Sequence, residues 1–263
     1  MRDILDQISD KQENDHPGIG RWLSAPAVAT MFLTRLPVRG PQVALAGAVV
    51  AFPLVGVLVG ALGGGAFWLA ALAGLPVLAC ALIALAVTAI ATGALHEDGL
   101  ADTADGLAGH TPEDSIRIMR DSSIGGYGVL AMIFSVGLRV AALAAIADPL
   151  AVVLAMAAVG AVSRAAMPGV MLALPKASKT GLAAAAGKPA AVDVAFGIAL
   201  AALLALALPG PAGALAIFAA TAIATLAVAI LARRRLGGYT GDILGAVQQM
   251  AEITALLTLT ALL

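Results

Sequence analysis

The feature that most constrains this chain is a series of long apolar segments that carry almost no charge. A transmembrane helix needs about 20 mainly apolar residues to cross roughly 30 Å of hydrocarbon. Seven segments meet this requirement: residues 43–72, 76–95, 124–147, 149–172, 189–208, 211–232 and 241–262. Unpaired backbone groups are very costly in lipid, so each segment is expected to be a helix. The predicted fold is an all-α, polytopic membrane helix bundle.

The composition excludes several other classes of protein. The 263 residues are 61% hydrophobic and 12% charged, whereas a soluble domain carries about 25% charged residues. A net charge of −1 does not suit a basic nucleic-acid-binding protein. A single cysteine cannot form the disulfides of a small secreted domain. We therefore expect contact with a lipid bilayer and none with nucleic acid.

The N-terminal part of the chain differs from the rest. Residues 1–24 are predicted to be a polar tail, and residues 25–263 a single transmembrane catalytic domain. Within that domain, residues 25–37 are apolar but too short and too charged to cross, so an interfacial or re-entrant helix is expected there. No signal peptide is expected, because no apolar region follows a basic start.

The basic residues predict the orientation of the spans. They occur in the N-terminal segment, in the loop 96–123, at 176–188 and at 233–235, whereas the connections on the opposite side carry none. Loops rich in Lys and Arg stay in the cytoplasm. We therefore expect the N-terminus, the loop 96–123 and the polar chemistry of the chain to face the cytoplasm.

Carboxylates dominate the loop 96–123. Asp98, Asp102 and Asp105 are spaced i, i+4, i+7, which places them within about a 60° arc of one helix face. Like charges so arranged repel unless a cation neutralises them. Mg²⁺ takes oxygen ligands and is commonly shared between carboxylates and substrate phosphates. The spacing favours a magnesium site, which Glu97 joins only where the helix starts or bends; the alternative is a solvated acidic loop.

The residues that follow offer two features suited to anions. Arg120 and Asp121 are either a surface ion pair or an arginine clamp on phosphate oxygens with an acid beside it. The glycine-rich residues 125–128 surround Tyr127 and open the third predicted span. Backbone N–H groups at such a helix start bind anions.

Two arginines lie inside the predicted spans. Ionisable residues at membrane depth usually face a polar cavity or a partner. Arg164 lies near the cytoplasmic end of its span and is a candidate for binding a substrate phosphate. Arg139 either pairs with a carboxylate such as Asp242 or Glu252, a structural role, or faces a polar cavity and takes part in function.

The last span carries a polar stripe. Asp242, Gln249 and Glu252 recur at i, i+7, i+10 on one helix face, and Tyr239 lies between glycines just before it. The stripe indicates either substrate binding or hydrogen bonding between helices.

Glycines recur at every fourth residue of the first predicted span, at Gly56, Gly60 and Gly64. Small residues at this spacing let two helices approach closely. The stripe predicts close helix packing, either within the chain or between two copies in a homo-oligomer.

Taken together, these segments resemble the bacterial cobalamin synthases, the adenosylcobinamide-GDP ribazoletransferase family. The resemblance extends from residue 32 to about 252 and leaves out the polar tail. It rests on FLTRLPV (32–38), FPLVG (52–56), HEDGLADTADGL (96–107), RIMRDSSIGGYGV (117–129), SR (163–164) and GGYTGDILGA (237–246).

The resemblance implies a Mg²⁺-dependent phosphotransferase of the bacterial cytoplasmic membrane. Such an enzyme joins adenosylcobinamide-GDP to α-ribazole or its 5′-phosphate and releases GMP, late in cobalamin biosynthesis. The metal ligands carried over are Glu97, Asp98, Asp102 and Asp105.

Phosphoryl transfer of this kind needs charge neutralisation and positioning more than covalent help from the protein. Arg120 or Arg164 would stabilise the departing phosphate, and Asp105 or Asp242 would accept the proton of the attacking ribazole oxygen. The residues expected to bind substrate are Arg120, Asp121, Tyr127, Arg164, Tyr239, Gln249 and Glu252.

Three other functions share some of these features. A membrane prenyltransferase also binds a diphosphate through Mg²⁺, but it normally has two facing aspartate clusters. A CDP-alcohol phosphotransferase has a DG-xx-AR motif, which DGLADT does not match. A transporter would place arginines at membrane depth but would not need the acidic, glycine-spaced loop.

Overall fold

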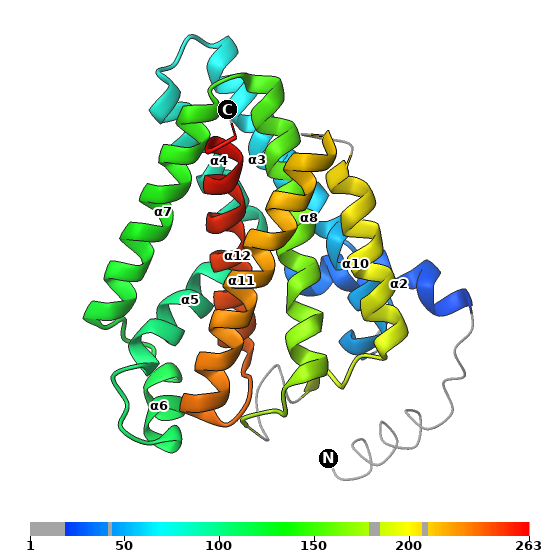
Figure 1. The fold of residues 1–263 in the computed structure, drawn as a ribbon, viewed down its shortest axis with the longest axis vertical. Coiled ribbons are helices and arrows are strands. Elements are labelled where there is room, and N and C mark those ends of the chain that lie inside the picture. The colour runs from blue at the N-terminus through cyan, green and yellow to red at the C-terminus, as the bar shows by residue number, and fades with distance from the viewer. Residues whose placement is uncertain (1–18, 42–43, 179–184, 207–209, 263) are drawn as a thin grey trace.

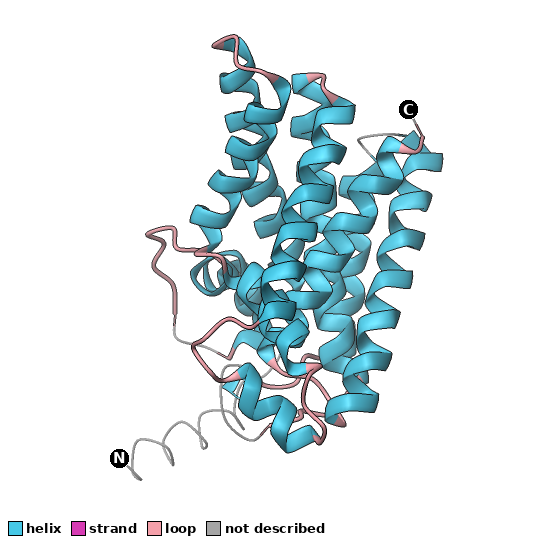
Figure 2. Cartoon of the chain, turned by 90° about the vertical axis from the view of Figure 1, so that its left-hand side faces the viewer, coloured by secondary structure: helices cyan, strands magenta, loops and turns pink. Residues whose placement is uncertain are grey.

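The structure, a computed structural model, describes residues 19–41, 44–178, 185–206 and 210–262, and these form a bundle of helices (Figures 1 and 2). Within these ranges the only β-type pairing is an isolated bridge between Lys176 and Tyr239, so the all-α prediction is confirmed. The helices are α2 (Ile19–Leu33), η1 (Leu45–Ala51), α3 (Phe52–Leu72), α4 (Val77–Thr92), α5 (Leu95–Gly106), α6 (Pro112–Met119), α7 (Gly126–Ile146), α8 (Pro149–Ala173), α10 (Ala191–Leu206), α11 (Gly210–Leu236) and α12 (Gly241–Thr260).

Five helical segments in the described residues are long and apolar enough to cross a membrane, which is fewer than the seven predicted. They are Leu45–Leu72, Gly126–Ile146, Pro149–Ala173, Pro211–Leu236 and Gly241–Thr260. The described part of α10 and the whole of α4 have 16 residues each, which is too short. A sixth span results only if α4 is counted together with α5, from which it is separated by a bend of 91°.

The bend between α4 and α5 has a local cause. Gly93 and Ala94 both have left-handed backbone conformations, with φ of 66° and 55°. The segment predicted as one span over 76–95 therefore ends at Thr92. The chain then turns inward, and α5 buries much of its surface, including Leu100 and Ala101. The acidic segment is thus a packed helix and not a surface loop.

The glycine stripe of α3 packs against α8 within the same chain. A Cβ atom on Gly60 would lie 2.1 Å from the carbonyl oxygen of Met156, and one on Gly56 would lie 2.1 Å from that of Gly160. The close-packing prediction is confirmed. The alternative, a homo-oligomer formed through this stripe, is wrong because α8 already covers it.

The N-terminal helix begins earlier than expected. We predicted a helix over 25–37 after a polar tail, whereas α2 starts at Ile19 and ends at Leu33. Residues 1–18 of the predicted tail lie outside the described residues. The indole N–H of Trp22 donates to Asp193 of α10 at 3.2 Å, which fastens α2 to the bundle.

The connections divide between the two ends of the bundle. The α3–α4 and α7–α8 turns lie at the same end as the C-terminus, whereas α5, α6 and the α11–α12 turn lie toward the other (Figure 1). The arginines of the last turn of α11, at 233–235, lie at this second end. The polar and basic connections are therefore gathered at one end, as the sequence predicted.

Candidate functional site

The site is built where α5 crosses the start of α12. A Cβ atom on Gly99 would lie 2.8 Å from the carbonyl oxygen of Asp242 and 3.1 Å from Cα of Gly245. The two backbones meet at these glycines because no side chain separates them. This contact brings Asp98 of α5 and Asp242 of α12 to the wall of one cavity, although they are 144 positions apart in the sequence.

This open cavity, here called the outer cavity, has a volume of about 270 Å³. Its apolar wall includes Phe32, Leu45, Phe52, Met119, Met167 and Met171. Its polar wall includes Asp98, Arg120, Ser178, Thr240 and Asp242. A cavity of this kind suits a bulky, largely apolar ligand that also carries charge. The methionines and Ser178 were not predicted as site residues, because their spacing gives no signal.

The charges at the outer cavity are unevenly balanced. Asp102 lies within range of repulsion from Asp98, Asp242 and Asp105. Neither Asp98 nor Asp102 forms an ion pair with any described residue. The Asp242 carboxylate accepts a hydrogen bond from the Thr240 hydroxyl at 3.2 Å. The cluster is therefore an acidic one that attracts a cation.

Arg120 supplies the positive charge on this wall. Its Nη2 donates to the hydroxyl of Ser178 at 2.6 Å, and its guanidinium lies close enough to attract the carboxylate of Asp242. A guanidinium carries five N–H donors in a planar fork, a geometry that suits the oxygens of a phosphate.

The donor set fits an open magnesium site better than a closed one. In the described part of the chain, no three His, Cys, Asp or Glu side chains are grouped so as to hold a metal by themselves. Mg²⁺ does not require such a cage, because it retains water and binds through one or two carboxylates and substrate phosphates. Asp98 and Asp242 line the outer cavity, and Asp102 lies behind them within electrostatic range of both.

Asp105, the fourth predicted ligand, faces α7. Its side chain is buried, and its two oxygens accept hydrogen bonds from the backbone N–H groups of Gly125 (2.7 Å) and Gly128 (2.8 Å). The anion site predicted at the start of this helix therefore exists, and the anion that the structure places there is Asp105.

Glu97 faces into the bundle, away from the outer cavity. Its Oε1 accepts from Nη1 of Arg139 at 3.4 Å and from Nε2 of Gln249 at 3.2 Å. The same Nη1 donates to Oε1 of Glu252 at 3.1 Å. The expected pairing of Arg139 with a carboxylate of the last span is confirmed for Glu252. We call Glu97, Arg139, Arg164, Gln249 and Glu252 the inner cluster.

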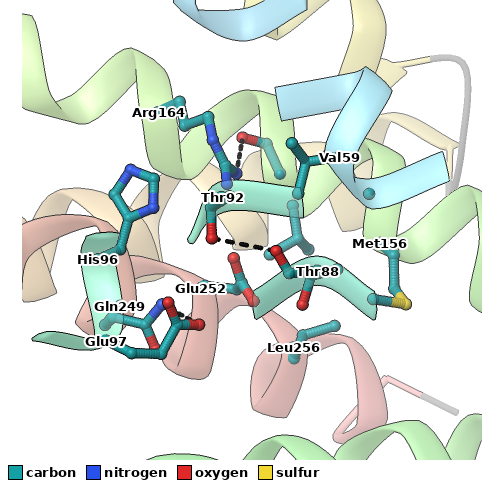
Figure 3. Close-up of a pocket in the computed structure, with 13 residues that line it drawn as sticks. Val59, Thr88, Thr92, His96, Glu97, Met156, Arg164, Gln249, Glu252 and Leu256 are labelled. Atoms are coloured by element: carbon teal, nitrogen blue, oxygen red, sulfur yellow. Dashed lines mark hydrogen bonds between the residues drawn. The ribbon is translucent and has the colours of Figure 1, made fainter. Parts of the chain in front are cut away.

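Arg164 lines a second, smaller cavity inside the bundle, shown in Figure 3. Three buried atoms at or near this cavity have no hydrogen-bond partner among the described residues: Nε of Arg164, Oε2 of Glu97 and Nε2 of His96. His96 lines both cavities and so forms part of the wall between them. It was not predicted as a site residue, although it stands next to Glu97 in the sequence.

Asp121 and Tyr127 lie with Asp105 along an open surface groove. The hydroxyl and the backbone N–H of Ser123 donate to Asp121, and these hydrogen bonds hold the pKa of that carboxyl below its usual range. The partner of Asp121 is thus Ser123, and the interpretation of Asp121 as an ion-pair partner of Arg120 is wrong.

Tyr239 is buried in the apolar core, 1% exposed, and does not line the outer cavity. Its backbone N–H donates to the carbonyl of Pro175 at 2.9 Å, and its carbonyl accepts from Ala177 at 2.9 Å. These bonds fix the segment that carries Ser178 to the start of α12. Tyr239 therefore supports the wall of the cavity from behind.

These observations define an all-helical, polytopic membrane protein. Its acidic helix α5 turns into the bundle from one end and meets the start of α12 there. A sequence model of one family, described as cobalamin-5-phosphate synthase, matches residues 25–260. The chain belongs to this family.

Relatives with a given name agree with this assignment. One from Bradyrhizobium diazoefficiens is 47% identical over 239 residues, which cover 89% of this chain and 92% of the relative. One from Rhizobium etli strain CIAT 652 is 46% identical, covering 90% of this chain and 96% of the relative. Both are named adenosylcobinamide-GDP ribazoletransferase. No solved structure matches the chain.

Proposed function

We propose that this chain catalyses the reaction for which its relatives are named, the joining of adenosylcobinamide-GDP to ribazole or its 5′-phosphate with release of GMP. The observation that carries the proposal is the outer cavity, where a large apolar wall meets Asp98, Asp242 and Arg120. A corrin joined to a nucleotide through a diphosphate combines the same two properties, a bulky body and a compact charge.

The polar wall is where the diphosphate binds. Asp98, Asp102 and Asp242 would hold Mg²⁺, which when bound neutralises charge on the two phosphates. Arg120, held by Ser178, donates to the oxygens of the phosphate that leaves with GMP. These side chains bind and orient the substrate, and none of them forms a covalent bond with it.

The transfer step breaks the bond between the two phosphates. A ribose hydroxyl of the acceptor attacks the phosphorus on the cobinamide side, and the bridging oxygen departs with GMP. The Asp242 carboxylate, oriented by the hydroxyl of Thr240, accepts the proton of the attacking hydroxyl. The apolar wall limits access of water, which would otherwise compete as an acceptor.

The inner cluster supports this site from within the bundle. Glu97 precedes Asp98 in α5, and its bonds to Arg139 and Gln249 fix that turn of the helix against α7 and α12. Arg164 and Glu252 also belong to this cluster and do not line the outer cavity. We assign them to holding α5 in place, and not to direct contact with the substrate.

The same proposal places the protein in the bacterial cytoplasmic membrane, with α5 and α6 toward the cytoplasm. Arg117 of α6, Arg120 just after it and the arginines of the last turn of α11 support this orientation, because basic connections are retained on the cytoplasmic side. Nucleotide substrates are also available on that side.

The test is release of GMP by membranes that contain the protein, supplied with adenosylcobinamide-GDP, α-ribazole and Mg²⁺. We expect GMP and a corrin product in equal amounts, and loss of both in Asp102→Asn. Glu113→Gln is the matched control, because Glu113 is an exposed acid on the neighbouring helix and lies outside the outer cavity. It should keep the wild-type rate.

The alternatives give different products. Pyrophosphate released from an isoprenoid diphosphate would indicate a prenyltransferase, and uptake of a solute without GMP would indicate a transporter. Wild-type turnover by Asp102→Asn would contradict the assignment of the carboxylates.

A further inference from the structure

Asp105 differs from the other carboxylates of α5 because both of its oxygens are already bound by the protein. It accepts hydrogen bonds from the N–H groups of Gly125 and Gly128 at 2.7 and 2.8 Å. Its residue is 8% exposed, whereas Asp98 is exposed and Asp102 partly exposed. A ligand therefore reaches Asp98 and Asp102 more easily than Asp105.

The glycines that bind Asp105 leave no room for a side chain. A Cβ atom on Gly125 would lie 2.5 Å from Oδ1 of Asp105, and one on Gly128 would lie 2.4 Å from Oδ2. A Cβ atom on Gly126, between them, would meet nothing within 4 Å. Two of the three glycines are thus needed for the carboxylate to approach the backbone, and the third is not.

Asp105 also supplies the cap that α7 lacks. The first N–H groups of a helix have no partner within the helix, and a negative charge near them is stabilising. The N-cap position of α7 is Gly125, which has no side chain to offer. The carboxylate comes instead from α5, through hydrogen bonds of the strong, charge-assisted kind.

The end of α5 is held at a second point. Nη2 of Arg235 donates to the carbonyl oxygens of Leu107 and Gly109, the latter at 3.1 Å. These contacts and the Asp105 contacts fix the C-terminal end of α5 to α11 and α7. Asp102 lies about one turn before that end, so its direction depends on them.

We propose that Asp105 is a positioning residue and not a metal ligand: its hydrogen bonds to the amides of Gly125 and Gly128 set the orientation in which α5 presents Asp98 to the outer cavity and holds Asp102 beside it. This proposal rests on the proposed function for its kinetic consequences, but not for the hydrogen bonds themselves.

The first experiment compares Asp105→Asn, Gly128→Ala and the control Gly126→Ala in the GMP-release assay. Removing a group that orients a metal ligand typically costs roughly 10- to 100-fold in metal affinity or activity. We expect kcat to fall by that factor in the first two variants, with little change in KM. Gly126→Ala should keep the wild-type kcat. The double variant Asp105→Asn/Gly128→Ala should be no slower than the slower single variant, because both changes break one contact.

The second experiment separates positioning from ligation without using activity. Mn²⁺ binding to the purified protein, followed by electron paramagnetic resonance, should persist in Asp105→Asn with unchanged stoichiometry and be lost in Asp102→Asn. Hydrogen–deuterium exchange of residues 125–128 should be faster in Asp105→Asn than in the wild type, and this measurement does not depend on whether Gly128→Ala folds.

Three results would overturn the proposal: loss of Mn²⁺ binding in Asp105→Asn as complete as in Asp102→Asn, wild-type kcat in Gly128→Ala, or unchanged exchange at 125–128 in Asp105→Asn. Failure of the proposed function looks different. In that case the wild type releases no GMP, whereas the Mn²⁺ binding and exchange results still report on the Asp105 hydrogen bonds.

Discussion

Replacing Arg139 by Gln should destabilise the protein more than most single substitutions, because of the charge it balances. The side chain is 2% exposed and lies 3.4 Å from Glu97 and 3.1 Å from Glu252. With Arg164, the inner cluster holds two positive and two negative side chains. Removing Arg139 leaves one buried negative charge without a counterion.

The size of the effect follows from that count. Removing one partner of a buried ion pair costs about 3–5 kcal/mol, most of which reflects the charge left behind. In Arg139→Gln/Glu97→Gln the numbers of positive and negative charges are again equal. We therefore expect the double variant to be less destabilised than the sum of the two single variants, with a coupling of roughly 0.5–3 kcal/mol.

The assay is equilibrium unfolding of the purified protein in detergent micelles, with the four members of the cycle measured under one condition. Leu138→Ala is a useful control, since the neighbouring side chain is exposed on α7 and carries no charge to balance. A change below about 1 kcal/mol in Arg139→Gln, or strict additivity in the double variant, would show that the cluster is not a charge-balanced unit.

Three further predictions follow from the packing and from the acidic cluster. Gly60→Ala should destabilise the protein by about 1–3 kcal/mol, because its Cβ would lie 2.1 Å from the Met156 carbonyl oxygen; Gly65→Ala, in open space on the same helix, should be neutral or stabilising in the same unfolding assay. Arg235→Ala removes the donor to the carbonyls at the end of α5, so limited proteolysis should cut residues 107–111 faster than in the wild type. An unchanged rate would contradict the role of Arg235 in fixing this end of the helix. Chelation of divalent cations should stop GMP release, and added Mg²⁺ should restore it; turnover in excess chelator would rule out the metal proposal.

The sequence predicts the helices well, because long apolar runs have few alternatives in a membrane. It fails at the junction of α4 and α5. Residues 76–95 are apolar throughout, and composition does not reveal that Ala94 adopts a left-handed conformation after Gly93. A single apolar run therefore predicts one span, whereas the chain turns by 91° within it.

The spacing of the acids predicts which helix face they share, but not which residues they contact. Asp98 and Asp105 lie on one face of a helix, as the period of 3.6 residues requires, but seven residues separate them by roughly 10 Å along its axis. The two ends of that face meet different neighbours, since Asp98 lines the outer cavity and Asp105 contacts the start of α7. Helical periodicity gives the direction of a side chain and not its partner, which depends on the packing of distant segments.

The shortness of α4 has a consequence for how substrates arrive. Sixteen residues of helix extend roughly 24 Å, several ångströms less than the hydrocarbon layer. A helix of this length that starts at one headgroup region ends short of the other. Under the proposed function, the polar turns of α5 would then begin within the hydrocarbon layer, and the nucleotide would reach the acids through a water-filled entrance.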